Sequence, residues 1–199
     1  SNTLDYSAYD AGDDDKGVYV NLNEGSATRV QKFIKNIQNL VSSPFDDIFI
    51  GHESENNNFS FVDNWGNDDI TLGGGLNTLD FSRIMASLHI TLAEDKISVI
   101  SSNNKDKITF LGENLPQALD KIIGGQGGNI FEIKKSYTVS LYGGAGDDIF
   151  RFADGVTIDG QLDGRGGSNT IDYSGYTTAR EIKLTELRGV DGFAGLEDS

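Results

Sequence analysis

Aspartate and asparagine side chains that follow glycine-rich turns are the residues of this chain whose type and spacing suggest chemistry. The segment Gly143–Arg151 fits the nonapeptide pattern G-G-x-G-x-D-x-U-x at every specified position, where U is a large apolar residue. The chain carries 31 acidic against 16 basic residues, a net charge of −15, and this field attracts cations and repels nucleic acid. A metal ion is therefore the favoured partner. Degraded copies of the pattern place an aspartate or asparagine at the sixth position as Asp47, Asn57, Asp68, Asn77, Asn129 and Asn169.

The sixth positions recur at a nearly constant interval, which indicates the elements that must hold them. Successive positions on one edge lie 19 and 21 residues apart in the second half of the chain, and 21 and 20 apart in the first half. Two nonapeptides fill such an interval, each giving a turn that permits positive φ and a short strand with an inward apolar residue. We therefore predict an all-β fold, a right-handed parallel β-solenoid with coils of about 20 residues. Asp47 and Asp68 would lie on one edge, and Asn57 and Asn77 on the opposite edge.

A longer repeat is superimposed on the turns. The hexapeptide Asn-Thr-Leu-Asp-Tyr-Ser at 2–7 returns in similar form at 77–82 and 169–174. We interpret residues 1–199 as one continuous solenoid fragment with internal modules 2–76, 77–168 and 169–199, the last of them truncated. Because the chain begins inside a repeat and stops in a glycine-bearing loop, we expect neighbouring repeat modules of the same parent chain.

The hexapeptide also repeats a carboxylate, at Asp5, Asp80 and Asp172. A ladder of cation sites is one interpretation, and a cap on a local turn is the other. After each hexapeptide comes an alternating apolar and polar run, at 18–22, 88–92 and 182–184. Period-two alternation predicts strands with one buried face.

These turns resemble the haemolysin-type calcium-binding repeat, also called the repeats-in-toxin family, which occurs in large bacterial secreted and surface proteins. The resemblance implies a parallel β-roll in which Ca²⁺ lies between successive turns, held by sixth-position aspartates and turn carbonyls. Carried over to this chain, it implies metal ligands at Asp148 with Gly144 and Gly146, and at Asp68 and Gly66 with Asp47. It further implies an extracellular or cell-surface location.

The chain departs from that family where asparagine replaces aspartate. Calcium takes about six to eight oxygens, usually with several carboxylates, whereas Asn129 and Asn169 offer only neutral amide oxygens beside Asp148. The other interpretation is that these asparagines, with Asn57 and Asn77, hydrogen-bond from turn to turn in a ladder that needs no metal. We expect calcium sites that are few or weak.

Catalysis has little support in the sequence. The two histidines, His52 and His89, fall in different modules, and there is no cysteine, no G-x-S-x-G elbow and no phosphate-binding loop. No stretch approaches the roughly 18 apolar residues of a membrane helix, so membrane insertion is not expected. We predict a non-catalytic structural or adhesive segment of a bacterial repeat protein.

The alternative function is a β-helix that binds or degrades polysaccharide. Such a protein would need two carboxylates converging with arginine or lysine in a groove, or an exposed aromatic strip, for which Tyr19, Trp65 and Tyr176 are the candidates. Surface glycans or other cell-surface proteins would then be partners.

Overall fold

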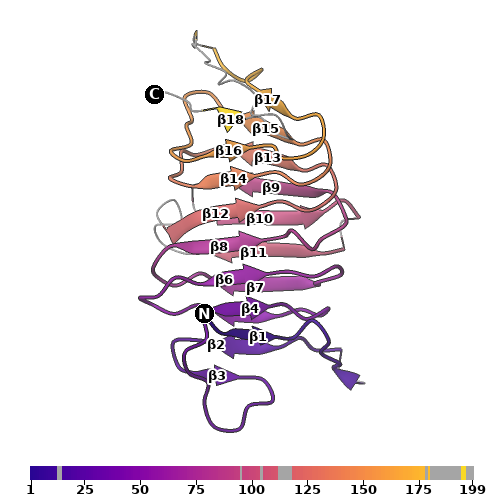
Figure 1. The fold of residues 1–199 in the computed structure, drawn as a ribbon, viewed down its shortest axis with the longest axis vertical. Helices are drawn as coiled ribbons and strands as arrows, with labels where there is room; N and C mark the ends of the chain where they lie inside the picture. The colour runs from indigo at the N-terminus through magenta and orange to yellow at the C-terminus, as the bar shows by residue number, and fades with distance from the viewer. Residues whose placement is uncertain are drawn as a thin grey trace.

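The regular secondary structure of the described chain is almost entirely β-strand, arranged in two sheets in which parallel pairs predominate (Figure 1). The structure, a computed structural model, describes residues 1–12, 15–94, 96–103, 105–111, 118–177, 179 and 194–195. The prediction of an all-β chain with parallel sheets is confirmed. The expected strand at 182–184 lies outside the described residues. Within the described ranges, no helix is long and apolar enough to cross a membrane.

The first sheet has eight strands, and all its pairs are parallel except the last. In spatial order these are β1 (Thr3–Asp5), β4 (Asn39–Val41), β6 (Asn58–Ser60), β8 (Asn77–Asp80), β12 (Leu119–Ile123), β14 (Ser140–Tyr142), β16 (Leu162–Asp163) and β18 (Ala194–Gly195).

The second sheet has ten strands and contains three antiparallel pairs. In spatial order these are β17 (Thr170–Asp172), β15 (Ile149–Phe152), β13 (Ile130–Ile133), β9 (Leu88–Leu92), β10 (Lys96–Ser101), β11 (Lys107–Leu111), β7 (Asn67–Thr71), β5 (Ile48–Ile50), β2 (Tyr19–Asn21) and β3 (Ser26–Ala27).

From β4 to β9, and again from β12 to β17, the chain crosses from one sheet to the other at every strand. We call a stretch that gives one strand to each sheet a coil. Ile130 of β13 pairs with Ile149 of β15, and Ile149 pairs with Thr170 of β17, so parallel neighbours lie 19 and 21 residues apart. This register brings the sixth-position side chains of successive turns beside one another.

The core lies between the two sheets and is filled largely by aromatic and branched side chains. Phe49 of one sheet faces Phe59 of the other at 6.5 Å between ring centroids. Rings of successive coils also stack, with Phe131 and Phe150 at 4.7 Å. Alternation sends these residues inward because every second residue of a strand points to the same face.

The ten-stranded sheet contains an insertion. β8 and β12 are direct neighbours in the eight-stranded sheet, but the chain between them forms three strands, β9, β10 and β11, instead of one. β10 is antiparallel to both β9 and β11, and it buries Ile97 and Val99. The ten-stranded sheet therefore has two more strands than a regular coil would contribute at this level.

The three hexapeptides do not occupy equivalent places. The first two copies form β1 and β8 in the eight-stranded sheet, whereas the third forms β17 in the ten-stranded sheet. The hexapeptide thus recurs as a local strand-and-turn unit, in either sheet.

Candidate functional site

The sixth-position side chains link each turn to the coil on its N-terminal side. In six of the described turns, Oδ1 of the aspartate or asparagine accepts a hydrogen bond from a backbone N–H of that neighbouring coil, over 2.7 to 3.3 Å. The donor N–H groups belong to residues at, or just before, the first residue of a strand in the neighbouring coil. The acceptors are Asp47, Asp68, Asn77, Asn129, Asp148 and Asn169.

The residue just before the sixth position makes the opposite link. Oδ1 of Asp46, Asn56 and Asp147 accepts from the backbone N–H of Asn67, Leu76 and Ser168 respectively, one coil toward the C-terminus, over 2.7 to 2.8 Å. A pair of adjacent polar residues therefore ties one turn to both of its neighbours. Sequence reasoning missed this role of the fifth position, although the doublets Asp46-Asp47 and Asp147-Asp148 are visible in the sequence.

The asparagines also close their own turns. Nδ2 of Asn129 donates to the carbonyls of Gly125 and Gly127 at 3.0 and 2.9 Å. Nδ2 of Asn77 donates to Gly74, and that of Asn169 donates to Gly166, both at 3.1 Å. A carboxylate cannot make these bonds because it has no hydrogen to donate. Asparagine at the sixth position thus satisfies carbonyls of its own turn, which an aspartate there could not do.

Asp148 is fully buried and heavily hydrogen-bonded. Its Oδ1 accepts from the backbone N and the Nδ2 of Asn129, each at 2.7 Å, and its Oδ2 accepts from the backbone N of Gly144 at 2.8 Å. Burial raises the pKa of Asp148, and these hydrogen bonds oppose the rise. The carbonyl of Gly144 already accepts from the N–H of Gly166 at 3.1 Å. A cation at this turn would share oxygens that are in use, and Gly146 packs directly on Gly127 and Gly128.

Asp47 is likewise occupied by hydrogen bonds from its own turn and from the coil before it. Its Oδ1 accepts from the N–H of Val18 and the hydroxyl of Ser43, and its Oδ2 accepts from the N–H of Ser43. Burial raises its pKa. The role of Ser43 was not anticipated from the sequence, which gave only the weak turn signal Ser42-Ser43-Pro44.

Asp68 differs from the other two aspartates in having a free oxygen. Its side chain is 2% exposed, and its Oδ1 accepts from the N–H of Asp47 at 2.9 Å. Among the described residues, none hydrogen-bonds to Asp68 Oδ2. The neighbouring Gly66 donates its N–H to Oδ1 of Asp106 at 3.4 Å, an acidic neighbour that carries no turn motif in the sequence. A buried carboxylate oxygen without a partner is costly unless it takes up a proton or a cation.

The proton is one answer to that cost. Burial, reinforced by repulsion from Asp47, raises the pKa of Asp68 to about 10. Since the unfolded side chain ionises near 3.8, the folded protein holds a proton across this interval that the unfolded chain has lost. The stability contributed by protonated Asp68 is thus complete below pH 4 and declines as the pH rises toward 10.

This dependence is measurable without calcium. In urea unfolding with EDTA, we expect the stability difference between Asp68→Asn and the parent protein to grow in favour of the variant from pH 5 to pH 8. The difference in the free energy of unfolding should grow by up to about 1.4 kcal/mol per pH unit. The parent protein loses stability as the pH rises, whereas the neutral amide of the variant does not ionise. Parallel stability curves for the two proteins would contradict it.

The hexapeptide aspartates cap local turns. Oδ1 of Asp5, Asp80 and Asp172 accepts from the backbone N–H two residues later, at Ser7, Ser82 and Ser174, over 2.8 to 2.9 Å. This is the turn-cap interpretation. Asp172 also pairs with Arg151 at 2.8 Å, and Arg151 reaches Glu132 at 3.4 Å, along the outer face of the ten-stranded sheet.

The three aromatic candidates do not form a strip. Trp65 is fully buried and packs near Phe81, at 6.3 Å between ring centroids, so the prediction that it lies on an exposed ligand surface is wrong. A large ring beside a turn gains more by covering the core than by facing water. Tyr19 is 40% exposed on β2, and Tyr176 is half-buried against Tyr173 near the other end of the stack.

Within the described part of the chain, no group of three or more histidine, aspartate or glutamate side chains is arranged to hold a metal ion. A calcium site here would need turn carbonyls beside its carboxylates. No protein-family model matches this chain, and no curated protein matches it either.

Proposed function

We propose that this chain is a non-catalytic structural or adhesive segment of a large bacterial extracellular or cell-surface repeat protein. It winds as a right-handed parallel β-solenoid, with partial calcium-binding turns and further repeat modules of the parent chain as neighbours. The proposal rests on six hydrogen bonds, in each of which Oδ1 of a sixth-position side chain accepts from the coil on its N-terminal side. Side chains that tie each coil to the next serve a long, stiff stack, in which each repeat contacts only its neighbours.

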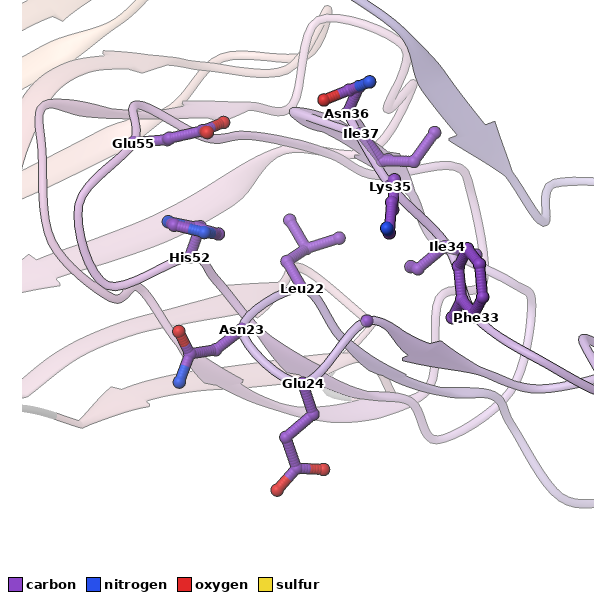
Figure 2. A pocket seen from close by; sticks show the side chains of 11 residues that line it. Leu22, Asn23, Glu24, Phe33, Ile34, Lys35, Asn36, Ile37, His52 and Glu55 are labelled. Atoms are coloured by element: carbon purple, nitrogen blue, oxygen red, sulfur yellow. The ribbon is translucent and has the colours of Figure 1, made fainter.

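The disposition of the charged side chains favours a non-catalytic role. Glu132 is engaged by Arg151 and Lys134 on the outer face of a sheet, and the buried aspartates accept backbone N–H groups. Acid and base work needs two carboxyl groups facing one substrate position. Glu24 and Glu55 border one hollow, but their carboxylates do not converge, since that of Glu24 is directed away from the other lining side chains (Figure 2).

The turn at Asp68 is the best calcium site on this proposal. There the one buried, unpartnered carboxylate oxygen of the described chain lies beside the turn around Gly66, and the carboxylate of Asp47 is near enough to repel it electrostatically. Calcium accepts such mixed sets of carboxylate and carbonyl oxygens, and extracellular modules bind it at about 10⁻⁴ to 10⁻³ M. The turn at Asp148 is a second, weaker candidate because neither of its carboxylate oxygens is unpartnered.

Calcium is therefore expected to stabilise the folded chain. At a concentration about ten to one hundred times Kd, binding to the folded state alone adds about 1.4 to 2.7 kcal/mol to the free energy of unfolding. The measurement is thermal and urea unfolding at pH 7.5 in EDTA and in calcium. Because the pKa of Asp68 is raised to about 10, calcium must displace its proton at this pH, so the increment should grow as the pH rises. Asp68→Asn should lose most of the increment, because it removes the unpartnered oxygen.

Magnesium at the same concentration is the control for simple screening of the −15 charge. It demands octahedral geometry and keeps its water, so it should stabilise much less than calcium does. Equal effects of the two ions, or an undiminished calcium effect in Asp68→Asn, would remove Asp68 from the proposed site. Identical melting curves with calcium and with EDTA would remove calcium from the function.

A further inference from the structure

A hollow of about 300 Å³ lies beside the first coils, and no motif of the sequence pointed to it (Figure 2). It is formed by the segment 33–37, the turn after β2, and the turn that begins at His52. We call it the N-terminal hollow. Its lining mixes apolar with polar side chains, among them Leu22, Phe33, Ile34, Lys35, His52 and Glu55.

Figure 2 shows Leu22 at the middle of the N-terminal hollow, with His52 on one side and Lys35, Ile34 and Phe33 on the other. The ring of Phe33 is 60% exposed, and Lys35 Nζ lies 4.7 Å from its centroid. An exposed phenylalanine beside an apolar floor loses the stabilisation that burial of its ring would give. The feature therefore offers an apolar platform to a ligand.

The polar groups of the hollow retain unused hydrogen-bonding capacity. Nδ1 of His52 accepts from the backbone N–H of Ser54 at 3.2 Å, so the neutral ring carries its hydrogen on Nε2. Oε2 of Glu55 accepts from Gln38 at 3.1 Å, which leaves Oε1. In the described part of the chain, His52 Nε2, Glu55 Oε1 and Lys35 Nζ have no hydrogen bond or ion pair, and Lys35 Nζ makes only its contact with the Phe33 ring.

The loop that builds the hollow is held in a demanding shape. Arg29 and Asn36 have φ of 63° and 56°, in the left-handed region that costs a non-glycine residue about 1 kcal/mol or more. The backbone of the loop is fixed by a hydrogen bond from Ile34 N to Gly25 O at 2.8 Å. Strain that is held in place in this way favours a preformed site over a chance depression.

From this geometry we infer that the N-terminal hollow binds one neutral sugar unit of a polysaccharide or glycan. A purely anionic ligand would meet Glu24, Glu55 and the −15 field of the chain. A purely cationic ligand is attracted by that field, but on the Phe33 platform its charge would lie against Lys35 Nζ, which is 4.7 Å from the ring centroid. Hydroxyl groups both donate and accept, so they satisfy His52, Lys35 and Glu55 together. The apolar face of a sugar ring covers Phe33. The inference does not depend on calcium at the turns.

Titration calorimetry tests it, using a panel of neutral, acidic and amino oligosaccharides of three to six units, each with calcium and with EDTA. We expect a neutral member to bind. Phe33→Ala should weaken that binding about tenfold or more, and Glu55→Gln should weaken it several-fold. Both side chains are exposed, so melting curves should show that the variants fold.

Met85→Ala is the matched control, because Met85 is 68% exposed and does not line the hollow. It should bind as the parent protein does. The inference is overturned if no neutral oligosaccharide binds at 10 mM, if acidic or amino sugars bind more tightly, or if Phe33→Ala binds unchanged. Calcium dependence of the melting curves would be unaffected by any of these outcomes, so the two proposals fail separately.

Discussion

Gly144→Ala is expected to lower the free energy of unfolding by about 3 kcal/mol or more, enough to unfold a marginally stable chain. A Cβ on Gly144 would lie 1.7 Å from the carbonyl oxygen of Gly125 in the adjacent coil. That oxygen belongs to the backbone and accepts a hydrogen bond from Asn129 Nδ2, so it cannot move without opening the turn. The φ of Gly144 is not in the left-handed region, so the cost is one of space alone.

Gly175→Ala is the matched control for this substitution. The nearest atom to its added Cβ is Phe152 O at 3.4 Å, and its φ is also outside the left-handed region. It should change stability by no more than about 0.5 kcal/mol. Urea unfolding followed by circular dichroism measures both. Equal effects of the two substitutions would show that the coils do not approach as closely as this contact requires.

Asp148→Ala is expected to cost about 3 kcal/mol, with or without calcium. The substitution leaves the backbone N–H groups of Asn129 and Gly144 buried without their acceptor, and each orphaned donor costs about 1 to 3 kcal/mol. Asn129 Nδ2 keeps its two glycine carbonyls, so its loss is smaller. The measurement is equilibrium unfolding in EDTA, where no metal contributes.

Asp148→Asn separates the hydrogen bonds from the charge. An amide retains Oδ1 for Asn129, and Oδ1 can also accept the N–H of Gly144, as Oδ1 of Asn129 accepts that of Gly125 at 3.2 Å. The chain itself uses asparagine at this position in the coils before and after, at Asn129 and Asn169. In EDTA the variant should lose about 1 kcal/mol or less. If asparagine proved as damaging as alanine, the carboxylate would have a role beyond linking coils. A calcium increment that disappears in this variant would assign an ion to this turn as well.

The coil interval was predictable because a physical requirement repeats with it. Each sixth-position side chain must reach a backbone N–H of the adjacent coil, so Asn129, Asp148 and Asn169 recur at the spacing of the strands themselves. Glycines precede them because a Cβ there would collide with the next coil, as at Gly144 and Gly125. Because the same contact between coils is made at each turn, the residues that make it recur at a regular spacing. This spacing can be recognised in a single sequence.

Other features were not predictable, for equally physical reasons. The alternation of Lys96–Ser101 is the same whether the strand enters a coil or an antiparallel insertion, so β10 could not be recognised. The hexapeptide specifies a strand and the aspartate that caps the following turn, but nothing in six residues selects the sheet. The unpartnered oxygen of Asp68 depends on residues such as Asp106 that meet it only after folding.

β10 and β11 are two extra strands on one side of an otherwise regular stack of coils. The eight-stranded sheet continues directly from β8 to β12 at this level, while the ten-stranded sheet gains two strands. The sixth-position hydrogen bonds from coil to coil form two separate series. One joins Asp47 and Asp68 on the N-terminal side of the insertion, and the other joins Asn129, Asp148 and Asn169 on its C-terminal side. Both sheets stay hydrogen-bonded through this level, since β13, β9, β10, β11 and β7 pair in turn while β8 pairs with β12. One face of the stack is therefore longer than the other by two strand spacings, about 10 Å, and the coils on either side of the insertion must be inclined to one another to accommodate it.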